Sequence, residues 1–341
     1  MFKNMMTRNL KKWVLAGALI AAFASAGAQD IGFSQFYANP LYLNPAFAGA
    51  KIAPRLSFSY RAQWPGLASA FTTVSASYDQ YFTDLHGGVG ARLMADRVGD
   101  HGLLSSTSFG AMYAFQFQVA HDIYISAALE ASLVNIALNW DNEIMRFPDM
   151  LDPLGNHGFV NNTQATMPDQ TSKFYPDFGA GVLAFSSYWY GGFAVAHLLR
   201  PDQGFYSEDP VAMKFTVHGG GLINVSEDAR RTSSLGLGTP IISPNIVYQY
   251  QGGLHYFNYG LYLDWMPFMV GLWYRHGSVN SDAMTFLAGI QYDMFKFGYS
   301  YDITVSKLAN STAGAHEITL GVMLPVPEKK KKYRAVQCPS F

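Results

Sequence analysis

Apolar and polar residues alternate along many short stretches of this chain. Between Arg55 and Trp64, every second residue is apolar: Leu56, Phe58, Tyr60, Ala62 and Trp64. The stretch from Ile123 to Leu133 repeats this pattern. Successive side chains of a strand point to opposite faces, so each stretch predicts a strand with one apolar and one polar face.

About fourteen such stretches follow one another, an even number as is usual for single-chain bacterial barrels. Many have about ten residues, the length that a tilted strand needs to cross the hydrocarbon core of a bilayer. The predicted strands lie near residues 54–64, 69–80, 86–98, 103–117, 121–137, 175–186, 188–198, 211–225, 240–251, 255–265, 268–277, 282–292, 295–304 and 314–324.

The connections between these strands alternate in length. With a periplasmic N-terminus, the odd-numbered connections face the cell exterior, and the longest one, 138–174, is the fifth. Most even-numbered connections are short, as expected for periplasmic turns. The connection 226–239 is the exception, and it indicates either a miscounted strand or a place where a periplasmic partner docks.

Composition supports a membrane barrel over a soluble sandwich. Only 14% of the 341 residues are charged and 15% are aromatic, whereas soluble domains carry about a quarter charged residues. After residue 28 no apolar run is long enough for a transmembrane helix, and only helices and closed barrels satisfy every backbone group in lipid. We therefore predict an all-β protein, a transmembrane antiparallel barrel over residues 54–324. The net charge of −1 argues against binding of nucleic acid.

The N-terminus predicts export. Four basic residues precede a short apolar run from Trp13 to Ala24, and a small-x-small site ends at Ala28, before Gln29. This order is typical of a cleavable signal peptide, here residues 1–28. The expected location is the outer membrane, in contact with its lipid.

Two further segments lie outside the strand pattern. Residues 29–53 contain Asn39-Pro40 and Asn44-Pro45, and proline makes such a segment unsuited to a central strand. It either plugs the lumen or forms a periplasmic stalk; we expect the plug, because a lumen of fourteen strands passes solute unless something fills it. The tail 325–341 is basic, with Lys329, Lys330, Lys331, Lys332 and Arg334, and is either a solvated end or a periplasmic contact.

Charged and aromatic residues within the strands have expected places. Five charged residues on the polar faces should line the lumen and pair with one another: Arg55, Arg61, Arg92, Asp96 and Glu130. Aromatic residues near strand ends are expected in the interfacial girdles. These are Trp64, Tyr78, Tyr81, Phe82, Trp140, Trp189, Trp265 and Trp273.

One N-terminal run resembles the signature of the PorP/SprF family of outer-membrane proteins, which belong to the type IX secretion and gliding-motility systems of Bacteroidota. Its residues include Phe36, Tyr37, Asn39, Pro40, Leu43, Asn44, Pro45, Phe47 and Gly49. Further matching motifs lie at 176–181, 190–192, 274–275, 299–302, 316–318 and the ending Cys338-Pro339-Ser340-Phe341.

This resemblance implies a function that the alternation does not. It implies a barrel that assists the export of a large secreted surface protein, typically a gliding adhesin, and holds its C-terminal domain at the outer membrane. Other type IX secretion components and periplasmic envelope proteins are further expected partners.

No pattern predicts a cofactor, a metal site or catalysis. The nine histidines are scattered, without a His-x-x-x-His or Cys/His pair. Gly219-Gly220-Gly221 and Gly87-Gly88 lack the Lys-Ser/Thr of a phosphate loop, so they predict bends or close packing within strands. Two alternative functions stay open: a channel for hydrophobic or small solutes, and a membrane-embedded hydrolase.

Overall fold

The alternating stretches pair into one continuous sheet. A computed structural model describes residues 30–67, 70–99, 102–140, 150, 164–225, 240–278, 282–305 and 312–325. The chain divides into two compact units, Met1–Asp30 and Ile31–Phe341, and the second contains all the described helices and strands. In the part of the chain so described, no helix is long and apolar enough to cross a membrane.

The sheet consists of strands at nearly all the predicted places. They are β1 (Arg55–Gln63), β2 (Phe71–Phe82), β3 (Gly87–Val98), β4 (Leu104–Ala120), β5 (Ile123–Leu138), β6 (Ser172–Phe185), β7 (Trp189–Ala196), β8 (Lys214–Gly221), β9 (Ile223–Asn224), β10 (Ile241–Gln251), β11 (Leu254–Trp265), β12 (Phe268–Gly277), β13 (Ala283–Tyr292), β14 (Phe295–Thr304) and β15 (Ala315–Met323).

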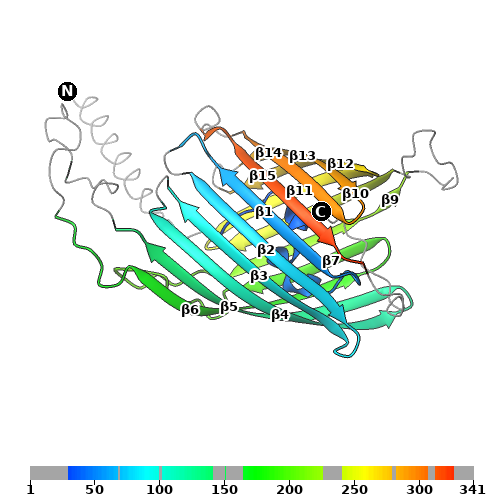
Figure 1. Cartoon of the computed structure of the whole chain (residues 1–341), viewed down its shortest axis with the longest axis horizontal. Coiled ribbons are helices and arrows are strands. Elements are labelled where there is room, and N and C mark those ends of the chain that lie inside the picture. Colours follow the sequence, from blue (N-terminus) through cyan, green and yellow to red (C-terminus); the bar gives the residue numbers. More distant parts are fainter. Residues whose placement is uncertain are drawn as a thin grey trace, which may run out of the picture. The chain divides into compact units, whose positions relative to one another are not determined.

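Neighbours in sequence are neighbours in the sheet, and the sheet closes on itself (Figure 1). All strand pairs are antiparallel; β1 pairs with β15, and β10 pairs with both β8 and β11. The two-residue β9 pairs with β10 in the register of β8, so it continues β8 beyond Leu222 and adds no strand to the ring. The result is a closed barrel of fourteen strands with β9 outside the count, as predicted.

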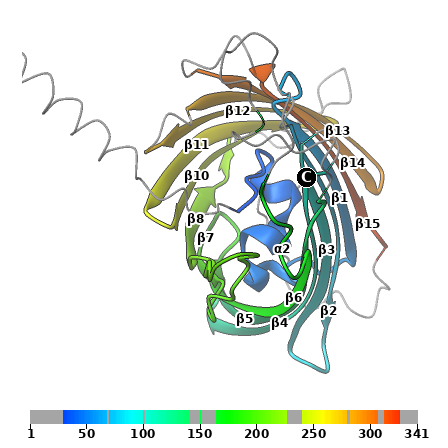
Figure 2. The ribbon, with the colours of Figure 1, turned by 90° about the vertical axis from the view of Figure 1, so that its left-hand side faces the viewer.

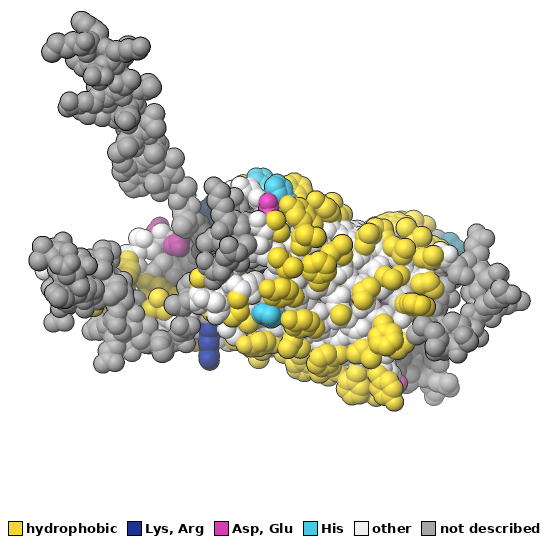
Figure 3. Space-filling view, turned by 90° about the horizontal axis from the view of Figure 1, so that it is seen from above, with side chains coloured by type: hydrophobic (Ala, Val, Ile, Leu, Met, Phe, Trp, Pro, Cys, Tyr) yellow, Lys and Arg dark blue, Asp and Glu magenta, His cyan; other side chains and the backbone are white. Residues whose placement is uncertain are grey.

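Burial follows the alternation within each strand. In β1, Ser57 and Ser59 are buried, whereas Phe58 and Tyr60 are 43% and 47% exposed. Figure 3 shows hydrophobic side chains spread over the visible face of the barrel wall. An outward apolar face and an inward polar face are the arrangement that lipid outside and a polar interior require.

The two ends of the barrel differ in their connections. At one end, which we call the short-turn end, lie 83–86, 121–122, 186–188, 266–267 and 293–294, together with the longer 225–240. The other, which we call the long-loop end, holds among others 139–171, 197–213 and 305–314. Both β1 and β15 meet the short-turn end, because Arg55 pairs with Met323. Apart from 225–240 and the two-residue 252–253, which lies at the long-loop end, the predicted alternation of short and long connections is confirmed.

The core of the molecule lies inside the barrel. Residues 31–50, which we call the lumenal segment, contain the helical turns η1 (Phe36–Ala38), α2 (Pro40–Leu43) and η2 (Pro45–Phe47). Figure 2 shows α2 surrounded by the strands. The segment forms one hydrophobic cluster with inward-facing side chains such as Met112, Leu183 and Trp273.

The prediction for Trp273 is wrong. We expected it in an interfacial girdle, but its side chain is buried in the lumen and only 2% exposed. It lies opposite Gly260 of β11, where a Cβ would overlap the indole ring. Both faces of β12 are apolar, so the alternation carried no signal for which face points inward.

Candidate functional site

The lumenal segment is hydrogen-bonded to several strands of the barrel wall. The nine signature residues named above all lie in it and are buried. Its two prolines occupy first-turn positions, Pro40 in α2 and Pro45 in η2, where the missing N–H costs nothing. The Asn-Pro steps therefore start short helical turns, which keep the segment compact.

Near the long-loop end, the segment binds a buried cluster of charges. The Arg61 guanidinium donates to Asp302 Oδ2 at 3.0 Å and to Glu317 Oε2 at 3.0 Å. The backbone N–H of Ser34 donates to Glu317 Oε2 at 2.8 Å, and that of Gln35 donates to Glu317 Oε1 at 3.2 Å. The two carboxylates thus join the first strand, the last two strands and the lumenal segment.

Ser34 and Gln35 complete this cluster with their side chains. The Ser34 hydroxyl donates to Asp302 Oδ2 and accepts from the Arg61 guanidinium at 2.7 Å. The Gln35 amide donates to the backbone carbonyl of Glu317 at 3.0 Å and accepts from the Thr319 hydroxyl at 2.7 Å. Because buried charges are costly unless paired and hydrogen-bonded, this arrangement fixes the segment to the wall.

Asn44 anchors the middle of the segment. Its side-chain oxygen accepts from Ala46 N–H at 2.9 Å and so caps η2. Its Nδ2 donates to the backbone carbonyls of Val182 at 3.1 Å and Phe193 at 3.3 Å, and lies 3.1 Å from His218 Nε2. Val182 and Phe193 are paired residues of β6 and β7, so one amide ties the segment to two adjacent strands.

Toward the short-turn end, the segment is bound to the wall through its backbone groups. The N–H of Gly49 donates to Asp79 Oδ2 at 2.9 Å, and Asp79 also pairs with Arg55 at 2.9 Å. The carbonyl of Ala46 accepts from Ser126 at 2.9 Å, and that of Ala48 accepts from Gln116 at 3.2 Å. Polar side chains of the wall therefore satisfy these two carbonyls of the segment.

Four inward-facing glycines make room for the segment. A Cβ on Gly88 would overlap the carbonyl of Ala48, and one on Gly90 would meet Leu41 at 3.1 Å. A Cβ on Gly181 would overlap the Asn44 side chain, and one on Gly192 would lie 2.8 Å from Asn44 Nδ2. The prediction of close packing is confirmed for Gly88, and the glycines of the 176–181 and 190–192 motifs serve the same purpose.

Aromatic rings fill the space between these anchors. The ring of Tyr37 packs against Tyr190, Tyr262 and Trp273, with centroids 5.5 to 6.4 Å apart. The ring of Phe47 stacks on His218 at 5.2 Å. His218 is therefore a packing and hydrogen-bonding residue of the lumen, which fits the expectation that the histidines belong to barrel and loops.

The predicted lumenal charges point inward. Arg92 pairs with Glu130 at 2.6 Å, and the Thr73 hydroxyl donates to Asp96 at 2.6 Å. Of the five residues predicted to pair with one another, only Arg92 and Glu130 do so. Arg55 pairs with Asp79, and Arg61 pairs with Asp302 and Glu317, three partners that the sequence analysis did not name. Asp302 and Glu317 lie within the 299–302 and 316–318 motifs, and that was the available signal.

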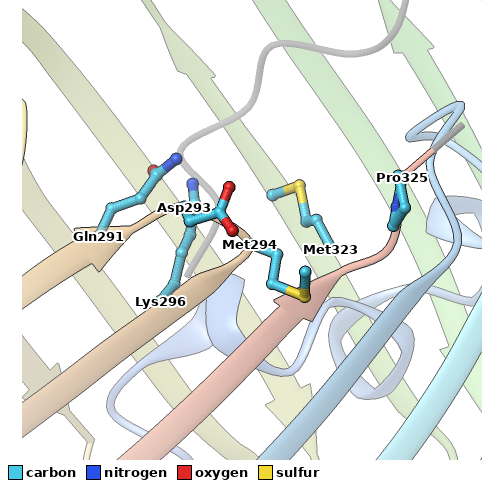
Figure 4. A pocket seen from close by; sticks show the side chains of 6 residues that line it. All are labelled: Gln291, Asp293, Met294, Lys296, Met323 and Pro325. Carbon is cyan, nitrogen blue, oxygen red and sulfur yellow. The ribbon is translucent and has the colours of Figure 1, made fainter.

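Other predicted sites lie outside the described residues. These are the cleavage site Ala28 and Gln29 and the basic residues Lys329, Lys330, Lys331, Lys332 and Arg334. A shallow pocket of about 200 Å³ lies at the short-turn end, close to the last described residue (Figure 4). It is lined by Gln291, Asp293, Met294, Lys296, Met323 and Pro325. Among the described residues, no group of three or more His, Cys, Asp or Glu is placed to hold a metal ion.

A closed barrel with an apolar outer face and a polar, filled interior defines this chain as a β-barrel protein of the outer membrane. Residues 25–322 match the family described as type IX secretion system membrane protein PorP/SprF, and the chain belongs to that family. Its role therefore lies in type IX secretion at the outer membrane.

Solved structures include other barrels of low sequence identity. The Acinetobacter baumannii outer membrane protein Omp33 is 9% identical, with a TM-score of 0.39 over 81% of this chain and 100% of that one. A TodX mutant described as a monoaromatic hydrocarbon channel is 10% identical, with a TM-score of 0.44 over 82% of this chain and 92% of that one. No curated protein has a matching sequence.

Proposed function

We propose that this chain is a non-enzymatic outer-membrane accessory of type IX secretion. It assists the export of a large, adhesin-like secreted protein and holds the C-terminal domain of that protein at the cell surface. Membership of the PorP/SprF family supports a role in secretion. The observation that carries the rest is the lumen, which is occupied by the chain's own residues 31–50.

A filled lumen suits a scaffold better than a conduit. The lumenal segment is hydrogen-bonded to β1, β15, β5 and β6, which lie on different sides of the ring. A secreted chain passing through this interior would have to break all these contacts together. Bacterial barrels turn their long loops outward. The long-loop end is then the surface that a client protein meets.

The test is a mild-detergent purification of the full chain from its native outer membrane, with mass spectrometry of every co-eluting protein. We expect stoichiometric recovery of a very large secreted protein or its C-terminal fragment. Recovery of the barrel alone, still folded by its heat-dependent gel shift, would contradict the proposal and favour the channel.

We further propose that residues 29–53 close the lumen to solutes. Deletion of 31–50 is expected to raise bilayer conductance and antibiotic entry, because it empties the hydrophobic cluster inside the ring. The heat-dependent gel shift of the deleted form serves as the folding control. Unchanged conductance of a folded, deleted barrel would contradict the seal.

Two further proposals concern the ends of the chain. We propose cleavage between Ala28 and Gln29, which N-terminal mass analysis of the mature protein tests directly. We also propose that the basic tail, Lys329 to Lys332 with Arg334, contacts periplasmic or envelope partners. Changing the four lysines to Gln should lower the recovery of such partners, and unaltered recovery would refute the contact.

A further inference from the structure

The wall of the barrel is not evenly paired around the ring. β5 and β6 pair along Tyr124–Ala137 and Ser172–Phe185, but β6 and β7 pair only from Ala180 to Phe185. Beyond that ladder, Leu198 N–H donates to the Phe178 carbonyl at 3.0 Å. Among the described residues, the part of β6 nearest the long-loop end, 172–177, therefore has a strand partner on one side only.

The direction of the backbone groups on this open edge follows from two bonds. The carbonyl of Phe178 points toward the β7 side, where Leu198 binds it, whereas the carbonyl of Lys173 faces β5 and accepts from Asn135 at 3.4 Å. Backbone groups alternate along a strand. The backbone carbonyls of Ser172, Phe174 and Pro176, and the N–H groups of the first two, thus point to the open side. No described residue pairs with these backbone groups on that side.

The residue types on the edge fit this geometry. Pro176 lacks an N–H, and proline within a sheet belongs on edge strands whose N–H side is unpaired. Phe174 is 71% exposed, compared with 54% for Phe109, which lies on the same outer face between two fully paired neighbours. Leu198 and Leu199, 41% and 63% exposed, follow β7 at the base of the edge. An apolar surface therefore flanks the open backbone groups.

An open edge of this kind is a template for an added strand. Within hydrocarbon the unpaired groups would be costly, so the open part must lie above the hydrocarbon layer or be covered by a partner. We infer that the 172–177 edge of β6 receives an extended strand from the C-terminal domain of the secreted client. This inference rests on the proposed function and adds to it the surface on which the client docks.

A second copy of the barrel does not fit the edge. Two copies in one membrane point the same way, and barrel strands tilt by about 35–45°. Two β6 edges that face each other across a twofold axis then cross at about twice the tilt, which prevents a ladder. An extended strand from another protein has no such constraint, and alternate apolar side chains on it would pack beside Phe174 and over Leu198 and Leu199.

The first experiment places a photo-crosslinking amino acid at Phe174 of the full chain in its native outer membrane. The matched control places the same amino acid at Phe109, on the same outer face. We expect an adduct with the large secreted protein from position 174 and none from 109. An adduct only with another copy of the barrel, or only within the chain, would overturn the inference.

The second experiment removes a donor from the edge without touching the β5 ladder. Phe174→Pro and, independently, Ser172→Pro each delete an N–H that points to the open side. We expect at least a tenfold loss of client recovery, with the heat-dependent gel shift of the barrel unchanged. Recovery at the unsubstituted level from both folded variants would overturn the docking edge but leave the proposed function standing. Absence of the client from the unsubstituted protein would overturn both.

Discussion

The lumenal segment is held by different means at its two ends. Near the long-loop end, Ser34 and Gln35 bind carboxylates that Arg61 neutralises. From its middle toward the short-turn end, Asn44 and Gly49 lie so close to wall glycines that an added Cβ would overlap a neighbouring atom, and the Gly49 N–H also donates to Asp79. A charged anchor tolerates small displacements but not the loss of a partner, whereas a close-packed anchor tolerates neither an added carbon nor a shift. The same segment is therefore vulnerable to two unrelated kinds of substitution.

The largest effect is expected from Arg61→Ala. It leaves Asp302 and Glu317 buried, with Arg275, 3.6 Å from Asp302, as the remaining nearby cation. Removing one partner of a buried ion pair costs about 3–5 kcal/mol. The measurement is the thiol-labelling rate of a cysteine placed at Ala38, in a chain whose Cys338 is changed to Ser. We expect a large rise in labelling or failure of barrel assembly.

Two controls belong to this charge experiment. Arg97→Ala, at an exposed position of β3, should leave labelling unchanged. The triple variant R61M/D302N/E317Q removes charge from both sides and should recover part of the protection. Slow labelling in a folded Arg61→Ala barrel would show that the charges do not hold the segment.

Adjacent glycines test the close-packed end. A Cβ on Gly192 would lie 2.6 Å from His218 Nε2 and 2.8 Å from Asn44 Nδ2, whereas one on Gly191 meets its nearest neighbour at 3.7 Å. Overpacking of this kind costs about 1–3 kcal/mol. We expect Gly192→Ala to raise Ala38-site labelling by about fivefold to a hundredfold, and Gly191→Ala to change it little. Equal effects from the two variants would contradict the close packing of Gly192 against Asn44 and His218.

A single neutral hydrogen bond should matter less than either anchor. Asn39 Nδ2 donates to Ser59 Oγ at 2.7 Å, and both residues are buried. Asn39→Ala should cost about 1 kcal/mol, because it leaves the Ser59 hydroxyl unsatisfied. The double variant N39A/S59A should cost less than the sum of the two single changes. Additive costs, measured by urea unfolding in detergent, would show that this bond contributes nothing.

The smallest effect is expected outside the lumen, at Asp202 in the 197–213 connection. Its pKa is lowered to about 2, first by the backbone N–H of Asp209 and then by Lys173 and the N–H of Gly204. A lowered folded-state pKa adds stability above the ordinary value near 3.8 and loses it as the pH falls toward 2. We expect faster amide exchange at Gly204 and Asp209 only below about pH 4, after correction for intrinsic rates. Asp202→Asn should remove this pH dependence, and a dependence that persists in the variant would assign it to another group.

The strands could be predicted from the sequence alone, because one face of each strand must contact lipid and the other must face a polar interior. Because of that requirement, apolar and polar residues alternate in nearly every strand. The intervals between the alternating stretches also marked most of the long and short connections. The sequence also marked residues 29–53 as unsuited to the sheet through two Asn-Pro steps. It did not resolve Trp273, because both faces of β12 are apolar there.

Tertiary structure decided where the lumenal segment goes and what holds it. Arg61 and Glu317 are 256 positions apart in the chain and meet only because the first and last strands close the ring. Asn44 finds its carbonyl partners on β6 and β7 only because Gly181 and Gly192 leave space on the inner face. Local alternation specifies which side of a strand faces inward. The pairing of distant residues across a closed lumen depends on ring closure and side-chain volume, which no local pattern encodes.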